Sequence, residues 1–140
     1  MGYNYLDTNI SQFRLISEWK RYGKLIIAYD FDNTVYDYHN NGLDIKPIVD
    51  LLNRAKNIGA YFIVHTARLE SEYEFIAKHL IKNNLPFDCI NENIPVTGFI
   101  TKKPFYNILL DDRAGLKSAY EDLKKVVEIM EISKEKNKNE

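Results

Sequence analysis

Continuous apolar runs along the chain mark the expected strands. Residues 25–29 (LIIAY) and 60–66 (AYFIVHT) contain no acidic residue, lysine or arginine. Such runs are typical of strands that are buried on both faces of a sheet. Residues 87–90 (FDCI) and 106–112 (YNILLDD) are further short runs, which we expect to form a third and a fourth strand.

Between these runs, apolar residues recur at spacings of three and four, which is the period of an amphipathic helix. The pattern predicts helices over residues 10–22, 47–58, 70–82 and 116–130. Gly23 is expected to end the first of them. The side chains expected to face inward are Ile10, Phe13, Ile16 and Trp19, then Ile48, Leu51, Leu52, Ala55 and Ile58, then Tyr73, Phe75, Ile76 and Leu80, and finally Leu116, Tyr120, Leu123, Val127 and Met130.

The alternation of strand and helix predicts an α/β fold. We expect a single-domain three-layer α/β/α sandwich, with a mostly parallel central sheet and helices on both faces. No linker rich in Pro, Gly or Ser divides the sequence, so residues 1–133 are expected to form one domain that begins with a helical segment at 1–23. Residues 134–140 are expected to form a frayed polar tail.

Charge and cysteine content narrow the class of protein. The 140 residues carry a formal net charge of -1 and include one cysteine, Cys89. A chain without a basic field is not expected to bind nucleic acid indiscriminately. A lone cysteine forms no internal disulfide, which fits a reducing compartment. No run is long enough to span a bilayer, and the first residues lack a signal-peptide pattern, so we expect a cytoplasmic protein without a membrane partner.

Polar side chains stand where the expected strands end. Asp30 and Asp32 follow the first strand, Thr66 ends the second, and Asp111 and Asp112 end the last. Because ligands of open α/β sheets bind beyond the carboxyl ends of parallel strands, we expect these side chains to converge on one edge. The simpler alternative for Asp30 and Asp32 is an aspartate-rich turn that caps a strand.

Four short motifs in this order carry a family resemblance. DFDNTV (30–35), HTAR (65–68), KKP (102–104) and LLDD (109–112) resemble the motifs of the haloacid dehalogenase superfamily of aspartate-nucleophile phosphohydrolases. The resemblance extends over residues 30–112 and implies the Rossmann-like fold of that superfamily. The ordered set is much more specific than its first member alone, because an Asp-x-Asp motif is common.

The resemblance implies catalytic roles for four residues. Asp30 is expected to attack the phosphoryl group, to form an aspartyl-phosphate and to bind Mg²⁺. Asp32 is expected to act as general acid and then general base, and to bind the metal through its backbone carbonyl. Thr66 would hydrogen-bond the phosphoryl group. Lys103, or else Lys102, would hold the phosphoryl oxygens; a solvated loop charge is the alternative for either lysine.

Further residues are expected to bind the substrate or the metal. The resemblance places Asp111 and Asp112 at Mg²⁺, one directly and the other directly or through water. Asn33, Thr34 and Arg68 are expected on the substrate side. Asn33 stands where a glycine is most common in the family, which is a mild departure because asparagine tolerates unusual backbone angles. Thr34 would brace the loop or serve as an ordinary turn hydroxyl, and Arg68 would reach the phosphate or open a helix in solvent.

The activity implied by the resemblance is that of a Mg²⁺-dependent phosphatase, a hydrolase acting on phosphoric monoesters. The segments 36–45 and 91–104, where family members carry cap domains, are too short for one here, so the chain looks capless. It is similar to a subgroup of short bacterial and phage proteins described as phosphatases. A nucleotide, a nucleic-acid end or another phosphomonoester would be the substrate, and nucleic acid would enter only as a substrate.

Two other functions are compatible with the sequence. One is a catalytically inactive module of the same fold that binds a phosphate or a nucleotide. The other is an interaction protein, in which the aromatic residues Phe13, Trp19 and Tyr22 of the first helix dock a partner. Core packing is the commoner use of such a stripe. The sequence leaves open whether the chain forms oligomers.

Overall fold

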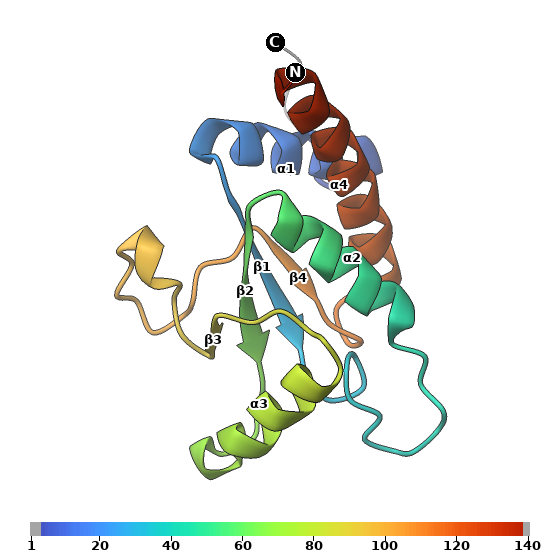
Figure 1. Cartoon of the computed structure of the whole chain (residues 1–140), viewed down its shortest axis with the longest axis vertical. Helices are drawn as coiled ribbons and strands as arrows, with labels where there is room; N and C mark the ends of the chain where they lie inside the picture. The colour runs from blue at the N-terminus through green and yellow to red at the C-terminus, as the bar shows by residue number, and fades with distance from the viewer. Residues whose placement is uncertain (1–3, 139–140) are drawn as a thin grey trace.

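The computed structural model describes residues 4–138, which form helices packed around a small sheet (Figure 1). The elements in chain order are α1 (Thr8–Tyr22), β1 (Leu25–Asp30), α2 (Lys46–Asn57), β2 (Ala60–His65), the 3-10 helix η1 (Glu70–Glu72), α3 (Tyr73–Lys82), β3 (Cys89–Ile90), the 3-10 helix η2 (Pro95–Thr97), β4 (Ile108–Leu110) and α4 (Leu116–Lys138). No helix among these residues is long and apolar enough to cross a membrane.

The four strands form one parallel sheet in the order β3-β2-β1-β4. Strand β1 lies in the interior of the sheet, where its residue Asp30 pairs in register with His65 of β2 and Tyr29 pairs with Leu110 of β4. The chain first adds β2 and β3 on one side of β1 and then crosses over to add β4 on the other. The predicted strands are confirmed, although the third and fourth are shorter than expected.

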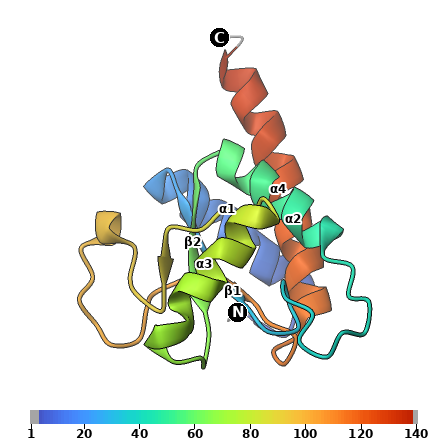
Figure 2. The ribbon, with the colours of Figure 1, turned by 60° about the horizontal axis from the view of Figure 1, so that its bottom comes forward.

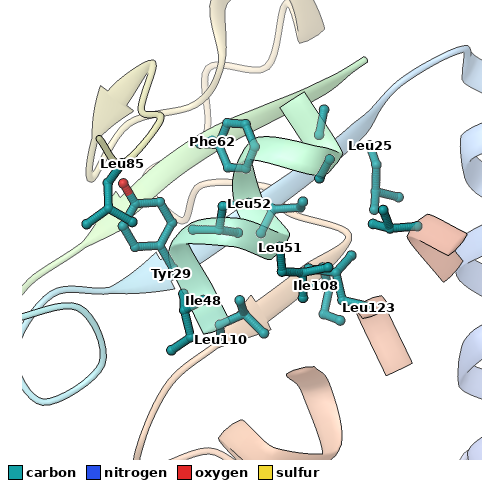
Figure 3. Close-up of a cluster of buried hydrophobic side chains, with 14 of the residues drawn as sticks. Leu25, Tyr29, Ile48, Leu51, Leu52, Phe62, Leu85, Ile108, Leu110 and Leu123 are labelled. Atoms are coloured by element: carbon teal, nitrogen blue, oxygen red, sulfur yellow. The ribbon is translucent and has the colours of Figure 1, made fainter. Parts of the chain in front are cut away.

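The main core lies on one face of the sheet, beneath α2 and α4. Figure 3 shows Leu25 and Tyr29 of β1 packed with Leu51 and Leu52 of α2 and with Leu123 of α4. These side chains are almost fully buried. Because alternate residues of a strand point to opposite faces, this face takes the odd-numbered residues of β1. The apolar periodicity of the second and fourth helices therefore identified their inward faces correctly.

The opposite face of the sheet is covered differently. Ile26 and Ala28 of β1 and Ile63 of β2 pack against Ile94 in the segment 91–107. This segment contains only the short helix η2, and Figure 2 shows it as a loop that stands to one side of the four longer helices. Helices, an all-parallel sheet and this third layer make up a single-domain, Rossmann-like α/β fold, which confirms the predicted fold class. The prediction of helices on both faces is wrong in this respect, because the apolar cluster on this face includes no described residue of α1, α2, α3 or α4.

Helix α1 lies at the end of the sheet where β1 begins, and α3 lies at the end where β1 and β2 finish (Figure 1). The first helix stops at Gly23, whose φ of 70° is the left-handed conformation that glycine adopts without strain. Leu15 and Trp19 of α1 are buried, whereas Phe13 is 60% exposed, so the predicted inward orientation of Phe13 is wrong. Phe75 in α3 is likewise 46% exposed, because it lies against other aromatic rings rather than in the core.

The last helix is longer than its apolar pattern. It continues to Lys138 instead of ending near Met130, so residues 134–138 of the predicted polar tail are helical, and residues 139–140 lie outside the described part of the chain. The extension carries mainly charged and polar side chains, which are exposed. Helical propensity of Lys and Glu sustains such a segment without burial, and hydrophobic periodicity cannot detect it.

Candidate metal centre

The polar residues predicted to converge do meet at one edge of the sheet. Strands β1 and β4 are neighbours that end side by side, and the direction of strand addition reverses between them. Asp30 is the last residue of β1, and Asp111 and Asp112 directly follow β4. Such a reversal opens a crevice at the carboxyl ends of the strands, where open α/β folds bind their ligands.

Three carboxylates form a compact cluster at this position. One oxygen from each of Asp30, Asp111 and Asp112 lies within 4.8 Å of the others. Burial raises the pKa of Asp30 to about 7, and a hydrogen bond with Asp112 and the charges of the neighbouring carboxylates act in the same direction. Like charges this close together are unfavourable unless a cation or a proton compensates them. Oxygen ligands from carboxylates are those that Mg²⁺ prefers, so the donor set fits this metal.

Thr34 connects the two strands that supply the cluster. Its hydroxyl oxygen lies 3.5 Å from a carboxylate oxygen of Asp30 and 3.4 Å from one of Asp112, and it accepts a hydrogen bond of 3.1 Å from the Asp112 backbone N–H. The side chain is fully buried. Thr34 therefore braces the carboxylates, and this position agrees better with the bracing role than with contact to a substrate.

A turn after β1 separates the two aspartates of the first motif. Asn33 has a φ of 63°, and its N–H donates to the Tyr36 carbonyl at 2.7 Å. The asparagine thus adopts the left-handed conformation that its glycine-like position suggested. As a result of this turn, the Asp32 side chain is not part of the three-carboxylate cluster and instead meets Arg68.

Arg68 holds the Asp32 carboxylate with two hydrogen bonds. Its Nε and Nη2 atoms donate to the two oxygens at 3.0 and 2.9 Å, and Nη1 donates to Glu72 at 3.3 Å. These bonds and the Asp32 charge hold the pKa of Arg68 above its usual range. A two-pronged arginine–carboxylate pair fixes orientation as well as charge. In this structure Arg68 is therefore a partner of Asp32 and Glu72 rather than a solvated arginine, and its contact with a phosphate stays a prediction.

Aromatic rings surround the Arg68 guanidinium. Its central carbon lies 5.4 to 5.9 Å from the ring centres of Phe31, Tyr36, Tyr38 and Phe75. Phe31 and Tyr36 are themselves stacked, with centres 5.0 Å apart. Cation–π attraction from several rings restricts where the guanidinium can move. Local sequence pattern does not predict this arrangement, because the rings come from the loop after β1 and from α3.

Thr66 follows β2 and is positioned by a residue that the sequence analysis missed. The Asn91 side chain accepts a hydrogen bond from the Thr66 N–H at 3.0 Å and donates to the Thr66 carbonyl at 2.8 Å. The Thr66 hydroxyl oxygen accepts from the Arg68 N–H at 3.0 Å, which leaves its own proton available to donate. The available signal for Asn91 was its position at the carboxyl end of the predicted third strand.

The two lysines expected near the phosphoryl group lie in a different environment. Lys102 and Lys103 are exposed in the segment 91–107. Within residues 4–138, neither forms an ion pair with the clustered aspartates or with Asp32. Lys103 instead lines a shallow hollow together with Phe99 and Tyr106. The structure thus groups Asp30, Asp111 and Asp112 with Thr34, and it pairs Asp32 with Arg68. A phosphoryl contact of Thr66, Lys102 or Lys103 stays a prediction.

Comparisons with known proteins add no assignment to this geometry. A scan against protein-family models, a search of curated proteins and a search of solved structures found no match to this chain.

Proposed function

We propose that this protein is a Mg²⁺-dependent phosphohydrolase of the haloacid dehalogenase type, which hydrolyses phosphomonoesters through an aspartyl-phosphate. One observation carries the proposal: the three-carboxylate cluster of Asp30, Asp111 and Asp112 at the reversal point of the sheet. The position of Thr34 supports it, because the hydroxyl lies 3.5 Å from a carboxylate oxygen of Asp30, the expected nucleophile, and 3.4 Å from one of Asp112, an expected metal ligand.

The chemistry divides into two displacements at phosphorus. A carboxylate oxygen of Asp30 forms a bond to phosphorus while the bond to the leaving oxygen breaks, and that oxygen takes a proton as it departs. Water then attacks the aspartyl-phosphate, loses a proton to a base, and releases phosphate and the free Asp30 carboxylate. Bound Mg²⁺ would neutralise the charge of the two anions that must approach each other.

The neighbouring residues support these steps by position. Asp32 is the proposed acid in the first displacement and base in the second, with Arg68 fixing its orientation. The Thr66 hydroxyl would donate to a phosphoryl oxygen, since its oxygen is already held by the Arg68 N–H. Lys103, or else Lys102, is the lysine that the resemblance assigns to the phosphoryl oxygens, and both side chains are exposed.

The proposed substrate is a phosphomonoester that needs no enclosing cap. The two segments in which a cap would be inserted form loops with one 3-10 helix. An open site accommodates the phosphorylated end of a large molecule as well as a small ester. A nucleotide or a nucleic-acid end with a terminal phosphate belongs to this class.

The proposal is tested by measuring phosphate release from p-nitrophenyl phosphate with Mg²⁺ and with EDTA. We expect turnover that requires Mg²⁺ and falls at least about 100-fold in Asp111→Asn, because a metal ligand is lost. Asp50→Asn is the matched control, since Asp50 is an exposed carboxylate in a surface ion pair with Lys46. Equal turnover in EDTA and in Mg²⁺ would contradict the metal-dependent mechanism.

Removing the Arg68 side chain is expected to impair turnover more than substrate binding. In Arg68→Ala, Asp32 loses the guanidinium that fixes its carboxylate, so we expect kcat to fall roughly 10- to 100-fold with a small change in KM. Arg68→Lys should restore little, because an ammonium cannot form the two-pronged contact. Steady-state kinetics on p-nitrophenyl phosphate check this; a rise in KM with unchanged kcat would instead indicate that Arg68 contacts the substrate.

The Arg68–Asp32 pair also favours a second candidate, a module that binds phosphate or a nucleotide without turnover. A carboxylate held on both oxygens by arginine is less free to exchange protons than an unpaired one. Mg²⁺-dependent binding of inorganic phosphate, measured by calorimetry, without turnover of any phosphomonoester would favour this module over the enzyme.

A further inference from the structure

A cavity lies at the end of β1 that is opposite to the carboxylate cluster. Lys24, which precedes β1, and Ile26, near the beginning of β1, form part of the cavity lining, whereas Asp30 ends this strand. Residues of α1 and of the segment 96–107 supply the remaining walls. The volume is about 570 Å³, which falls in the range of small-molecule sites. It is therefore a separate candidate site from the proposed phosphohydrolase centre.

Three aromatic side chains, Tyr22, Phe99 and Phe105, are part of the cavity wall, which is partly open to solvent. Phe99 and Phe105 meet edge to face with ring centres 5.3 Å apart, and Tyr22 contributes a third ring. Phe99 and Tyr22 are 49% and 61% exposed. Exposed rings gathered around one cavity are unusual on a protein surface that binds nothing. Flat rings of this kind favour a planar ligand.

The charges on the lining are predominantly positive. Arg21 and Lys24 form no ion pair with any residue in the described part of the chain, and the Arg21 guanidinium lies over the Tyr22 ring at 5.4 Å. The acidic lining residue, Glu18, is already engaged by Arg14 at 3.1 Å and by the Asn107 side chain at 2.8 Å. The cavity thus offers two uncompensated cations beside aromatic rings.

Hydrogen bonds hold the cavity wall in place. Asn93 accepts from the Phe105 N–H at 2.7 Å and donates to the Thr101 carbonyl at 3.1 Å, which closes the loop on itself. At the C-terminal end of the segment 91–107, the Asn107 side chain accepts a hydrogen bond from the Ile26 N–H at 2.7 Å. A wall ordered before binding loses less conformational entropy when a ligand arrives.

We propose that this cavity binds a nucleotide unit, with the base against Phe99 and Phe105 and the phosphate against Arg21 and Lys24. Aromatic rings stack on bases of any sequence, and neighbouring cations neutralise the phosphate. The same chemistry is presented by a free nucleotide and by a nucleotide within a single strand. The inference does not depend on the phosphohydrolase, because none of the cavity residues belongs to the carboxylate cluster.

The test is calorimetric titration of the full chain in EDTA with two probes that have no terminal phosphomonoester. These are adenosine 3′,5′-cyclic monophosphate and a short oligothymidylate with free hydroxyl groups at both ends. Adenosine is the uncharged control ligand. We expect Phe99→Ala and Arg21→Gln each to weaken binding about tenfold or more. Phe13→Ala and Lys20→Gln are the matched controls, since both residues are exposed on α1 outside the cavity lining.

Each outcome distinguishes a free nucleotide from a nucleotide within a single strand, or shows that the cavity binds neither. Tight binding of the cyclic nucleotide alone identifies a free-nucleotide site, and much tighter binding of the oligonucleotide identifies a strand-binding site. The proposal is overturned if neither probe binds better than adenosine, or if Phe99→Ala and Arg21→Gln bind both probes as the wild type does. Circular dichroism of these exposed-site variants establishes that they are folded.

Discussion

Asp30→Asn is expected to lower Mg²⁺-dependent turnover of p-nitrophenyl phosphate by a factor on the order of 10⁴ or more. Asp30 is the only member of the three-carboxylate cluster that belongs to a strand, and it sits with Asp111 and Asp112 within 4.8 Å. An amide oxygen is a much weaker nucleophile than a carboxylate, so the first displacement would be lost. Phosphate release under saturating substrate measures the effect, and residual turnover above a few per cent would exclude Asp30 as the nucleophile.

The thermal stability of Asp30→Asn shows whether the variant is folded. Its loss of activity should come with a gain in stability in EDTA, because burial and neighbouring charges raise the pKa of Asp30 from 3.8 to about 7. The folded carboxyl binds a proton more tightly than the unfolded one, so ionisation opposes folding as the pH rises. We expect a gain of about 1–2 kcal/mol after allowing for solvent screening of a half-buried group, or roughly 3–6 °C in Tm.

The dependence of this gain on pH follows from the two pKa values. The difference in Tm between Asp30→Asn and the wild type should be full above pH about 7, narrow as the pH falls towards 4, and vanish below the unfolded value of 3.8. Thermal melts in EDTA across this range measure it. A Tm for the variant below that of the wild type at pH 8 would show that Asp30 is stabilising and that the cluster is not electrostatically strained.

Trp19→Ala is expected to destabilise the protein by about 3–5 kcal/mol, or roughly 10–15 °C in Tm. Trp19 is 1% exposed and belongs to the main core. Truncating its side chain leaves a cavity between α1 and the sheet. Chemical denaturation followed by circular dichroism measures the free energy of unfolding, and a loss below 1 kcal/mol would contradict a core role.

Two control substitutions separate packing from surface effects. Trp19→Phe should cost much less than Trp19→Ala, because it keeps a ring and removes an indole N–H that has no hydrogen-bond partner among residues 4–138. Phe13→Ala should change stability by less than about 0.5 kcal/mol, since Phe13 is exposed. These results bear on the interaction-protein hypothesis, because loss of partner binding in Trp19→Ala would report unfolding, whereas Phe13 and Tyr22 remain available to a partner.

The sequence predicted the carboxylate cluster well, because local pattern and topology agree there. Apolar runs located β1 and β4, and parallel strands that end at one edge bring Asp30 close to Asp111 and Asp112. The left-handed turn at Asn33 was also readable, since asparagine replaces glycine with little strain. No part of this inference required knowledge of side-chain orientation.

Orientation was the property that local pattern did not supply. Arg68 could have pointed to a phosphate, yet it forms its two-pronged contact with Asp32 because the turn after β1 carries that carboxylate towards it. The aromatic rings around Arg68 come from separate segments, and Phe75, which was predicted to face the core, is half-exposed and lies beside the Arg68 guanidinium. Asn91 positions Thr66, which lies 25 residues earlier in the sequence.

The sequence by itself determined the order of strands and helices along the chain, the parallel α/β class and the convergence of Asp30, Asp111 and Asp112 at the ends of their strands. These follow from periodicity and from the geometry of a parallel sheet, both of which are local or topological properties. Only the tertiary structure decided which side chains pair, that Lys103 lines a hollow with Phe99 and Tyr106, and that α1 and the segment 96–107 line a cavity. Side-chain pairs and cavities depend on how segments that are distant in sequence pack against each other. The hydrophobic periodicity of a single segment does not determine the energy of those contacts.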